Sequence, residues 1–357
     1  MKVLNVTRAA RATLLLGSVM ASTALHAQTN VQIYGIVDVG VEYVNKARVS
    51  STGTATGSLA KVDSGNAAAS RIGFRGREDL GDGLAAVFGL ENGFSADTGV
   101  LANGGRLFGR QAYVGLAGKF GEVQLGRETT PIFDFGAIYD PMIPARYSAL
   151  ALDAAFASRA DNAIRYGGKF GGLTLSTQYS FGFDSTIVNG GEVPGAFQVG
   201  KEVSTNVNYQ FGNVLAGVLY DRQNGTSVAT QQNTVERMAL GITADFKPVK
   251  LYAAFQRRNM HTSPTSTRTN LYWVAMSYNP TAAVTLLAAA YSYDPAGASN
   301  RTGMYTLLGS YALSKRTDIY SELGVMRNQA KAAMALDGTV NPGDNQAGLT
   351  FGIRHRF

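Results

Sequence analysis

The chain has 357 residues, a formal net charge of +7 and no cysteine. The lack of cysteine excludes a disulfide framework, a thiolate nucleophile and a cysteine-ligated zinc site. The length suits either two ordinary soluble domains or one large barrel, and no basic run or clustered motif indicates nucleic-acid binding.

The first 27 residues predict a secretory signal peptide that is removed by cleavage. They contain a basic start, a short apolar run and a candidate cleavage site, namely Lys2, Arg8 and Arg11, then Ala12–Val19, then Ala24–Ala27. Leu25, at the −3 position, is larger than the residue usually preferred there. Cleavage would remove three basic and no acidic residues, which leaves a net charge of +4. The alternative is an amphipathic N-terminal helix, although a strand-like pattern begins abruptly near Asn30.

Residues 28–357 carry the pattern of β-strands. No stretch there approaches the ~18–20 apolar residues of a membrane helix, and the best candidate, Ala282–Tyr293, is too short. Apolar and polar residues alternate instead, as at the C-terminus, where Leu349 and Phe351 share one face and Thr350 the other. Such alternation gives a mean hydropathy near zero, as observed, so hydropathy does not exclude a strand-based membrane protein.

About sixteen alternating segments follow one another along the chain. They are predicted near 30–45, 66–78, 82–94, 106–117, 120–127, 159–168, 172–182, 201–211, 213–222, 234–245, 248–259, 269–279, 282–293, 301–312, 316–326 and 346–357. Short and long connections alternate between them, which is expected when one end of a barrel carries tight periplasmic turns and the other carries external loops. An even number of strands lets the first pair with the last and leaves no open edge. The sequence therefore predicts an all-β fold, an antiparallel transmembrane β-barrel.

Charged residues fall on the polar face of several predicted strands. Arg71, Arg75 and Arg77 alternate with Ile72 and Phe74. If the apolar side chains meet lipid, the arginines point into the lumen, because each arginine near the bilayer midplane would cost roughly 2–4 kcal/mol. The same alternation places other polar and charged residues inward, namely Tyr34, Asp38 and Glu42 in the first strand, and Arg159, Asp161 and Arg165. The lumen is thus predicted to be polar; the alternative is an exposed face of a soluble sheet.

The connection over 128–158 is the longest in the predicted barrel. Loops of this length are usually functional or disordered, and this one is rich in apolar residues that need a packing surface. It also contains Asp134, Asp140 and Asp153. We expect it to fold inward and narrow the channel, with its acids facing the arginines of the wall, so that a transverse field acts on each solute. The alternative is a surface loop in a subunit contact.

Catalytic signatures are missing from the sequence. After removal of the signal only His261 and His355 remain, and neither a Gly-x-Ser-x-Gly elbow nor a His-Glu-x-x-His motif occurs. We therefore expect no enzymatic activity, no cofactor and no metal. Arg106 and Arg110 break the alternation, since they share a face with Phe108. They are expected either above the membrane or against a neighbouring subunit.

Several stretches together resemble the Gram-negative general-diffusion porins, of the kind typical of beta-proteobacteria. The matching stretches are Val31–Asp38, Ser70–Leu84, Gly109–Leu116, Phe120–Arg127 and the terminal Phe357. The resemblance covers the whole chain after the signal. It implies a sixteen-stranded barrel, usually a homotrimer, whose third external loop folds into the pore. By position it assigns Arg71, Arg75, Arg127 and Arg159 to a basic pore wall and places Asp134 and Asp140 in the constriction loop.

The resemblance also implies a location and partners. These are the Gram-negative outer membrane with its lipid and lipopolysaccharide, the assembly machinery that reads Phe357, and small hydrophilic solutes and ions. Passive diffusion with a mild preference for anions is the leading hypothesis. A channel specific for a sugar, amino acid or organic acid is the alternative, followed by a barrel adhesin and, last, an outer-membrane hydrolase.

Overall fold

The architecture is given by a computed structural model that describes residues 30–184, 186, 191–297 and 299–357. The predicted signal peptide, residues 1–27, lies outside the described residues. In the described part the chain forms seventeen strands. They are β1 (Asn30–Arg48), β2 (Thr56–Ser64), β3 (Arg71–Gly81), β4 (Leu84–Gly93), β5 (Gln111–Gly118), β6 (Gly121–Thr129), β7 (Arg159–Phe170), β8 (Leu173–Ser180), β9 (Glu202–Phe211), β10 (Val214–Asn224), β11 (Thr234–Phe246), β12 (Val249–Thr262), β13 (Thr265–Tyr278), β14 (Val284–Pro295), β15 (Thr302–Ala312), β16 (Thr317–Asn328) and β17 (Gln346–Arg356).

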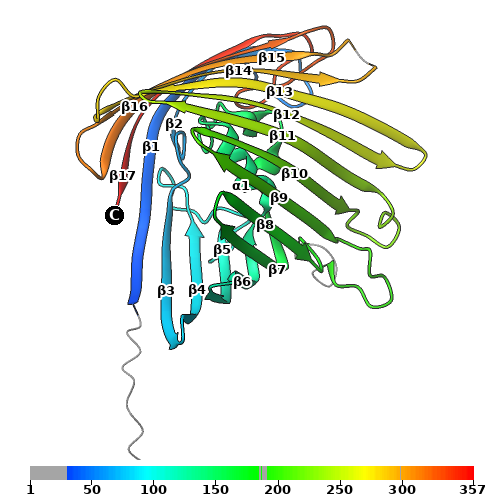
Figure 1. The fold of residues 1–357 in the computed structure, drawn as a ribbon. Coiled ribbons are helices and arrows are strands. Elements are labelled where there is room, and N and C mark those ends of the chain that lie inside the picture. The colour runs from blue at the N-terminus through cyan, green and yellow to red at the C-terminus, as the bar shows by residue number, and fades with distance from the viewer. Residues whose placement is uncertain (1–29, 185, 187–190, 298) are drawn as a thin grey trace, which may run out of the picture.

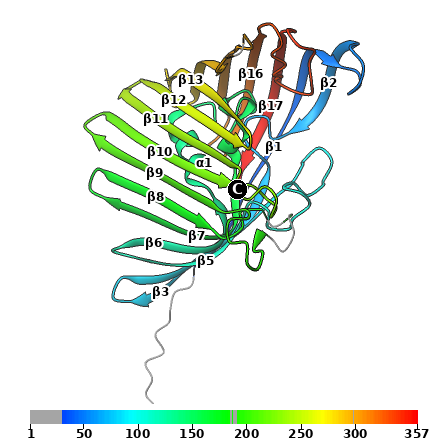
Figure 2. The ribbon, with the colours of Figure 1, turned by 90° about the vertical axis from the view of Figure 1, so that its right-hand side faces the viewer.

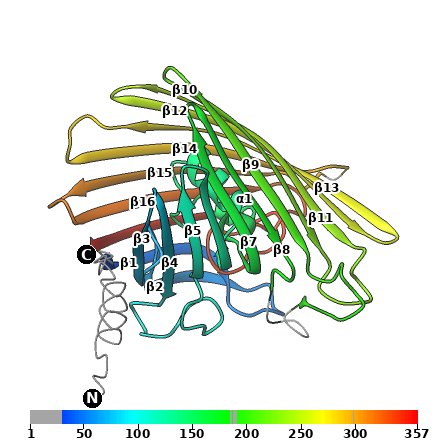
Figure 3. The ribbon, with the colours of Figure 1, turned by 60° about the horizontal axis from the view of Figure 1, so that its bottom comes forward.

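These strands close into a ring in which every neighbouring pair is antiparallel. Each strand from β3 to β17 pairs with the next, and β17 pairs back to β1. Gly35 and the C-terminal Phe357 exchange two backbone hydrogen bonds of 3.1 Å, so the chain end lies beside β1 (Figure 3). Residues 30–36 of β1 pair with β3, and residues 39–48 pair with β2. The strands β2 and β3 therefore share one strand position of the wall. The fold is therefore a closed sixteen-stranded antiparallel β-barrel, as predicted.

All sixteen predicted segments are strands, and β2 is the strand that the pattern did not predict. It lies in the connection that was expected to be a loop, after a polar stretch rich in Ser, Thr and Gly. Its outward residues are Ser58, Ala60 and Val62, which do not form the apolar stripe of the other strands. Pairing with the upper half of β1, rather than its own hydrophobic pattern, holds it in the sheet.

The two faces of the wall are the reverse of those of a soluble protein. Large apolar side chains point outward and are exposed, as with Ile33, Leu240 and Val274 at 63%, 58% and 59%. Polar side chains point inward and are buried, as with Asp38 and Glu42. An apolar exterior around a polar interior is the arrangement of a barrel that is surrounded by lipid.

The connection between β6 and β7 contains the helical part of the described structure. It holds α1 (Pro131–Tyr139) and two short 3-10 helices, η1 (Ala149–Ala151) and η2 (Ala154–Ala157). The hydroxyl of Thr130 accepts a hydrogen bond from the amide of Phe133 and caps α1, and Pro131 occupies its first turn. Figures 1 and 2 show α1 inside the ring of strands. Of the helices that the structure describes, none has the length and apolar character needed to cross a membrane.

Candidate functional site

The loop between β6 and β7 leaves the wall and returns to it at one point. The hydroxyl oxygens of Thr130 and Ser158 lie 2.6 Å apart, and the amide of Thr130 donates to the carbonyl of Ser158. Between these residues the chain forms a lobe that extends across the lumen. We call residues 130–158 the constriction loop. The expected inward fold of this loop is confirmed.

Tyr139 seats one part of the loop against the wall. Its ring covers Gly217 and Gly241, which are direct cross-strand partners on β10 and β11. A Cβ atom at either glycine would overlap the tyrosine, so the two glycines form a slot for its ring. The hydroxyl of Tyr139 donates to Asn208 Oδ1 at 2.8 Å, and its carbonyl accepts from the indole of Trp273 at 2.9 Å.

Tyr147 occupies a second slot of the same kind. Its ring lies over Gly324 and Gly348, which are cross-strand partners on β16 and β17. A Cβ atom on Gly324 would lie 2.7 Å from the ring. The hydroxyl of Tyr147 donates to Glu42 Oε1 at 2.7 Å. Two glycine pairs, far apart in sequence, thus receive the two buried tyrosines of the loop.

A small aromatic core fills the space between the loop and the wall. Trp273 of β13 makes edge contacts with Phe135 and Phe156 of the loop, at ring-centroid distances of 6.3 and 5.7 Å. All three side chains are buried. Loss of one such buried aromatic ring costs about 3–5 kcal/mol in protein cores, so this contact contributes strongly to the seating of the loop.

An ionic cluster ties the loop to β1, β2 and the connection between β16 and β17. Arg146 pairs with Glu42 and Asp337 at 3.1 Å each and also with Asp63. Lys61 of β2 pairs with the same three carboxylates, at 3.2 Å from Glu42 and 2.7 Å from the other two. Burial alone would lower the pKa of Arg146, but the surrounding carboxylates raise it above its ordinary value. The guanidinium therefore remains charged and links the loop, β1, β2 and the connection before β17.

The returning half of the loop is held by Asp153. Its carboxylate accepts hydrogen bonds from Arg237 at 3.1 Å and from Gln256 at 2.7 Å, on β11 and β12. Burial would raise the pKa of this carboxyl, but Arg237 and Arg258 hold it below its ordinary value. Asp153 is thus ionised, and its carboxylate binds the wall on the side of the loop that faces away from the channel.

The structure places the two predicted loop acids in different surroundings. Asp134 accepts from the guanidinium of Arg165, on β7, and from Ser176 Oγ at 2.9 Å. Asp140 has no exposed surface. Its carboxylate accepts from Tyr291 at 2.9 and 3.0 Å and from the amides of Met142 and Ala149 at 2.9 Å. The expectation that Asp140 faces the arginines is therefore wrong, because its carboxylate caps turns within the loop and bonds to Tyr291 of β14.

The arginines of the opposite wall form a cluster. Arg71 and Arg110 both pair with Glu91, and the distance from Arg71 Nε to Glu91 Oε2 is 3.6 Å. Arg127 pairs with Asp161. Arg159 donates to the carbonyls of Arg110 and Ala157 at 3.0 and 2.8 Å, and its guanidinium carbon lies 5.6 Å from the ring centroid of Phe133. Among the described residues no carboxylate lies within 4 Å of Arg159. Of the predicted basic residues, Arg71, Arg127 and Arg159 come together here.

Arg75 lies apart from this cluster. It follows Arg71 by four residues on β3, about 13 Å further along the wall. There it donates to Gln32 Oε1 at 3.0 Å and stacks 4.9 Å from the ring centroid of Tyr34. It faces the lumen as its position in the alternation predicted, but it belongs to a lower level than the other arginines.

Arg110 is a member of the cluster that the sequence did not indicate. The alternation placed it with Phe108 on the outer face, but β5 begins only at Gln111. The residues before that point are not extended, so strand parity does not apply to them. Arg110 and Arg106 turn inward instead, to Glu91 and to Asp161 and Asp184 respectively. The alternative that they face a neighbouring subunit is therefore wrong, because both side chains point into the barrel.

Comparison with known proteins agrees with this architecture. The family model described as Gram-negative porin matches residues 12–331. The chain belongs to the Gram-negative porin family. It is 31% identical to outer membrane porin protein 32 of Delftia acidovorans, over 94% of this chain and 97% of the relative, and 29% identical to an outer membrane porin protein of Bordetella pertussis, over 97% and 99%.

Solved structures match the porin over the same length. An anion-selective porin from Comamonas acidovorans has a TM-score of 0.80 and 28% identity, with 92% of this chain and 100% of that chain covered. The trimer form of OmpT from Vibrio cholerae has a TM-score of 0.67 at 15% identity, over 92% and 99%, and shares the fold. The protein is thus an outer-membrane porin of a Gram-negative bacterium, and its family and fold are those of channels.

The buried carboxyl of Asp140 predicts a pH dependence of loop seating. Burial raises its pKa to about 6, against hydrogen bonds from Ala149, Met142 and Tyr291 that lower it. The seated loop therefore binds this proton more tightly than an open loop. The free energy by which this proton stabilises the seated loop is fully present below about pH 4. It is lost, by up to about 3 kcal/mol, as the pH rises to and through about 6. Hydrogen exchange of residues 140–153 should show this fall in the native porin and not in Asp140→Asn. Equal pH slopes in both proteins would contradict it.

Proposed function

We propose that the porin is an open channel for passive diffusion of small hydrophilic solutes and ions, with a mild preference for anions. The observation that carries this proposal is the arginine cluster. Arg71 and Arg110 share Glu91, and Arg127 and Arg106 share Asp161, while Arg159 has no carboxylate within 4 Å among the described residues. The excess positive charge attracts anions into the narrow region and raises their local concentration.

The opposite side of the lumen supports the same preference. Asp134 is paired with Arg165, and Asp140 and Asp153 are buried within or behind the loop. The loop therefore presents little free negative charge to cancel the field of the arginines. The similar porin from Comamonas acidovorans is itself described as anion-selective, which is consistent with this proposal.

Single-channel recording in a planar bilayer under a salt gradient tests the proposal. We expect a steady conductance and a reversal potential of anion-selective sign. We also propose a homotrimer, a state named for the similarly folded OmpT, so conductance should appear in steps of three. A cation-selective sign would contradict the proposed selectivity, single steps would contradict the trimer, and no conductance at all would indicate a plugged barrel or an adhesin.

A solute-specific channel is the second candidate. It is favoured by the ring of Phe133, which lies beside Arg159 and offers an apolar contact next to a cationic one. An organic acid with an apolar body would contact both groups. Partial block of the current by such an acid, but not by chloride at equal concentration, would favour this reading over general diffusion.

Other partners and processing are proposed with the channel function. The signal peptide over residues 1–27 would be cleaved on export. Phe357 directly follows the closing strand β17 and is 43% exposed, which leaves it accessible to the outer-membrane assembly machinery. Outer-membrane lipid and lipopolysaccharide would surround the apolar wall. We propose no catalytic role, in keeping with a family and fold of channels.

A further inference from the structure

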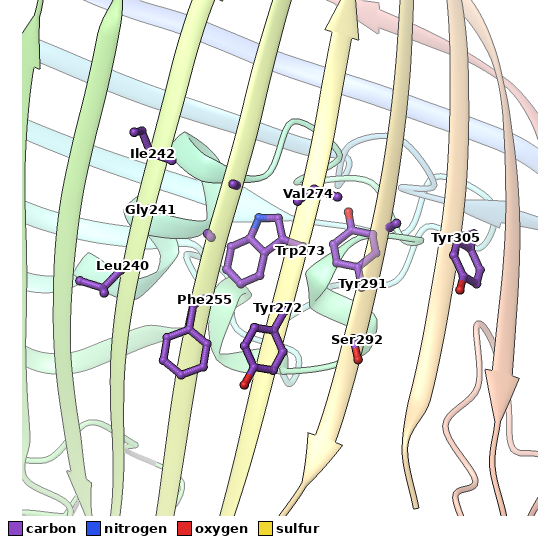
Figure 4. Close-up of a pocket in the computed structure, with 13 residues that line it drawn as sticks. Leu240, Gly241, Ile242, Phe255, Tyr272, Trp273, Val274, Tyr291, Ser292 and Tyr305 are labelled. Carbon is purple, nitrogen blue, oxygen red and sulfur yellow. The ribbon is translucent and has the colours of Figure 1, made fainter.

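Two apolar grooves run along the outside of the barrel between β11 and β16. The first, of about 630 Å³, lies between Ile242 and Leu240 on one side and Val274 and Tyr272 on the other, and it reaches Tyr305 (Figure 4). The second, of about 570 Å³, lies between Val274 and Leu323. Both volumes lie in the range of pockets that hold a small ligand.

Small residues form the floors of these grooves. In the register of the sheet, one row of outward positions reads Ile242, Ala253, Val274, Ala290, Tyr305 and Val325 across six strands. The alanines on β12 and β14 therefore alternate with larger side chains on β11, β13, β15 and β16. Ala290 lines both grooves. Two parallel furrows on a lipid-facing wall fit extended hydrocarbon chains.

Each groove ends at arginines on the side of the long loops. On β12 the outward position after Phe255 is Arg257, and on β16 the position after Val325 is Arg327. Arg268 lies on the outward face of β13 beyond Tyr272. Successive outward positions are about 7 Å apart, so Arg257 and Arg327 follow the apolar rows by one position and Arg268 follows Tyr272 by two, about 13 Å along β13.

Positive charge exceeds negative charge in this band. It contains five exposed arginines, namely Arg222, Arg257, Arg268, Arg301 and Arg327. Two of them are paired with carboxylates, Arg222 with Glu236 at 3.7 Å and Arg301 with Asp294 at 3.2 Å. For the other three, the described residues place no carboxylate within 4 Å. Guanidinium groups bind phosphate well, because their planar donors match its oxygens.

We propose that this outer wall binds a phosphorylated, multiply acylated lipid of the outer leaflet. Its acyl chains occupy the two grooves and its phosphates contact Arg257, Arg268 and Arg327. The proposal gives a site to the lipopolysaccharide contact proposed above and rests on long loops facing outward. The side chains involved point away from the lumen, so lipid binding and ion conduction are separately measurable.

The test is lipid-dependent thermal stabilisation of the detergent-purified porin. The probe is bis-phosphorylated hexa-acyl lipid A, compared with a zwitterionic diacyl phospholipid and with inorganic phosphate. A ligand that binds the folded state raises its melting temperature with concentration. We expect lipid A to stabilise the native porin, and the triple variant Arg257→Ala, Arg268→Ala, Arg327→Ala to need at least tenfold more of it for the same shift.

Matched variants separate this site from general charge and from packing. Lys247→Ala, Lys315→Ala and Arg316→Ala remove the same charge from the short-turn end and should leave the shift unchanged. Ala290→Phe fills both grooves and should weaken lipid A binding, whereas Ala86→Phe, on the outer face of β4, should not.

Three results would overturn the proposal. They are equal lipid A shifts in both triple variants, an equal shift from inorganic phosphate alone, or loss of the oligomer in Ala290→Phe with lipid binding intact, which would mean that a second copy covers the grooves. Conductance and reversal potential of the arginine triple variant should match those of the native porin. A native porin that does not conduct would refute the channel proposal and leave the lipid result standing.

Discussion

Replacing Arg71 and Arg127 together by alanine is expected to shift the reversal potential strongly toward cations. Both guanidinium groups lie in the cluster where arginines outnumber carboxylates, and their loss leaves Glu91 and Asp161 with fewer counter-charges. Two charges at 5–8 Å from a passing ion in water contribute about 1 kcal/mol together, with opposite sign for anions and cations. The free-energy difference between anion and cation therefore changes by about 2 kcal/mol, so the ratio of anion to cation permeability should fall roughly thirtyfold at low salt, and less at high salt.

A matched pair of substitutions outside the lumen is the control for this result. Arg268→Ala with Arg301→Ala removes the same charge from the outer wall and should leave the reversal potential where it is. An unchanged potential in the Arg71 and Arg127 double variant would remove these residues from the constriction. A shift of equal size in the control would mean that selectivity follows the overall charge of the protein.

Introducing alanine at Gly241 is expected to unseat the constriction loop. The new methyl group would overlap the ring of Tyr139, a residue that is fixed by the hydrogen bond of its hydroxyl to Asn208 and by the hydrogen bond from the Trp273 indole to its carbonyl. Overpacking of this kind costs about 1–3 kcal/mol, and the loop can relieve it by moving into the lumen. We expect an altered single-channel conductance and faster trypsin cleavage after Arg146, which lies in the same loop.

Gly309→Ala is the matched control, because its Cβ would meet only the side chain of Leu286, at 3.5 Å. This variant should keep the native conductance and protease resistance. Circular dichroism of each variant would verify that the barrel has formed. If Gly241→Ala behaves as Gly309→Ala does, the slot for Tyr139 does not hold the loop.

The amino-acid sequence by itself determined the barrel and the direction of most wall side chains. In β3 and β17 one face meets lipid and the other meets water. The polarity of each residue therefore indicates whether its side chain points outward or into the lumen. Arg71 could be placed in the lumen for that reason alone, because the outward position would expose its charge to hydrocarbon. The alternation of tight turns with long loops then indicated how successive strands are arranged in the barrel.

The tertiary structure decided what the alternation could not express. Residues outside strands, such as Arg110 and Asp140, have no parity, so their directions depend on contacts with distant segments. The slots for Tyr139 and Tyr147 arise from glycines on neighbouring strands, and these become partners only when the register of the sheet is set. The sequence thus determined which strands form and which faces meet lipid, because lipid acts on each residue separately. Where the loop is seated, and which arginines meet, depends on long-range pairing, which only the folded barrel provides.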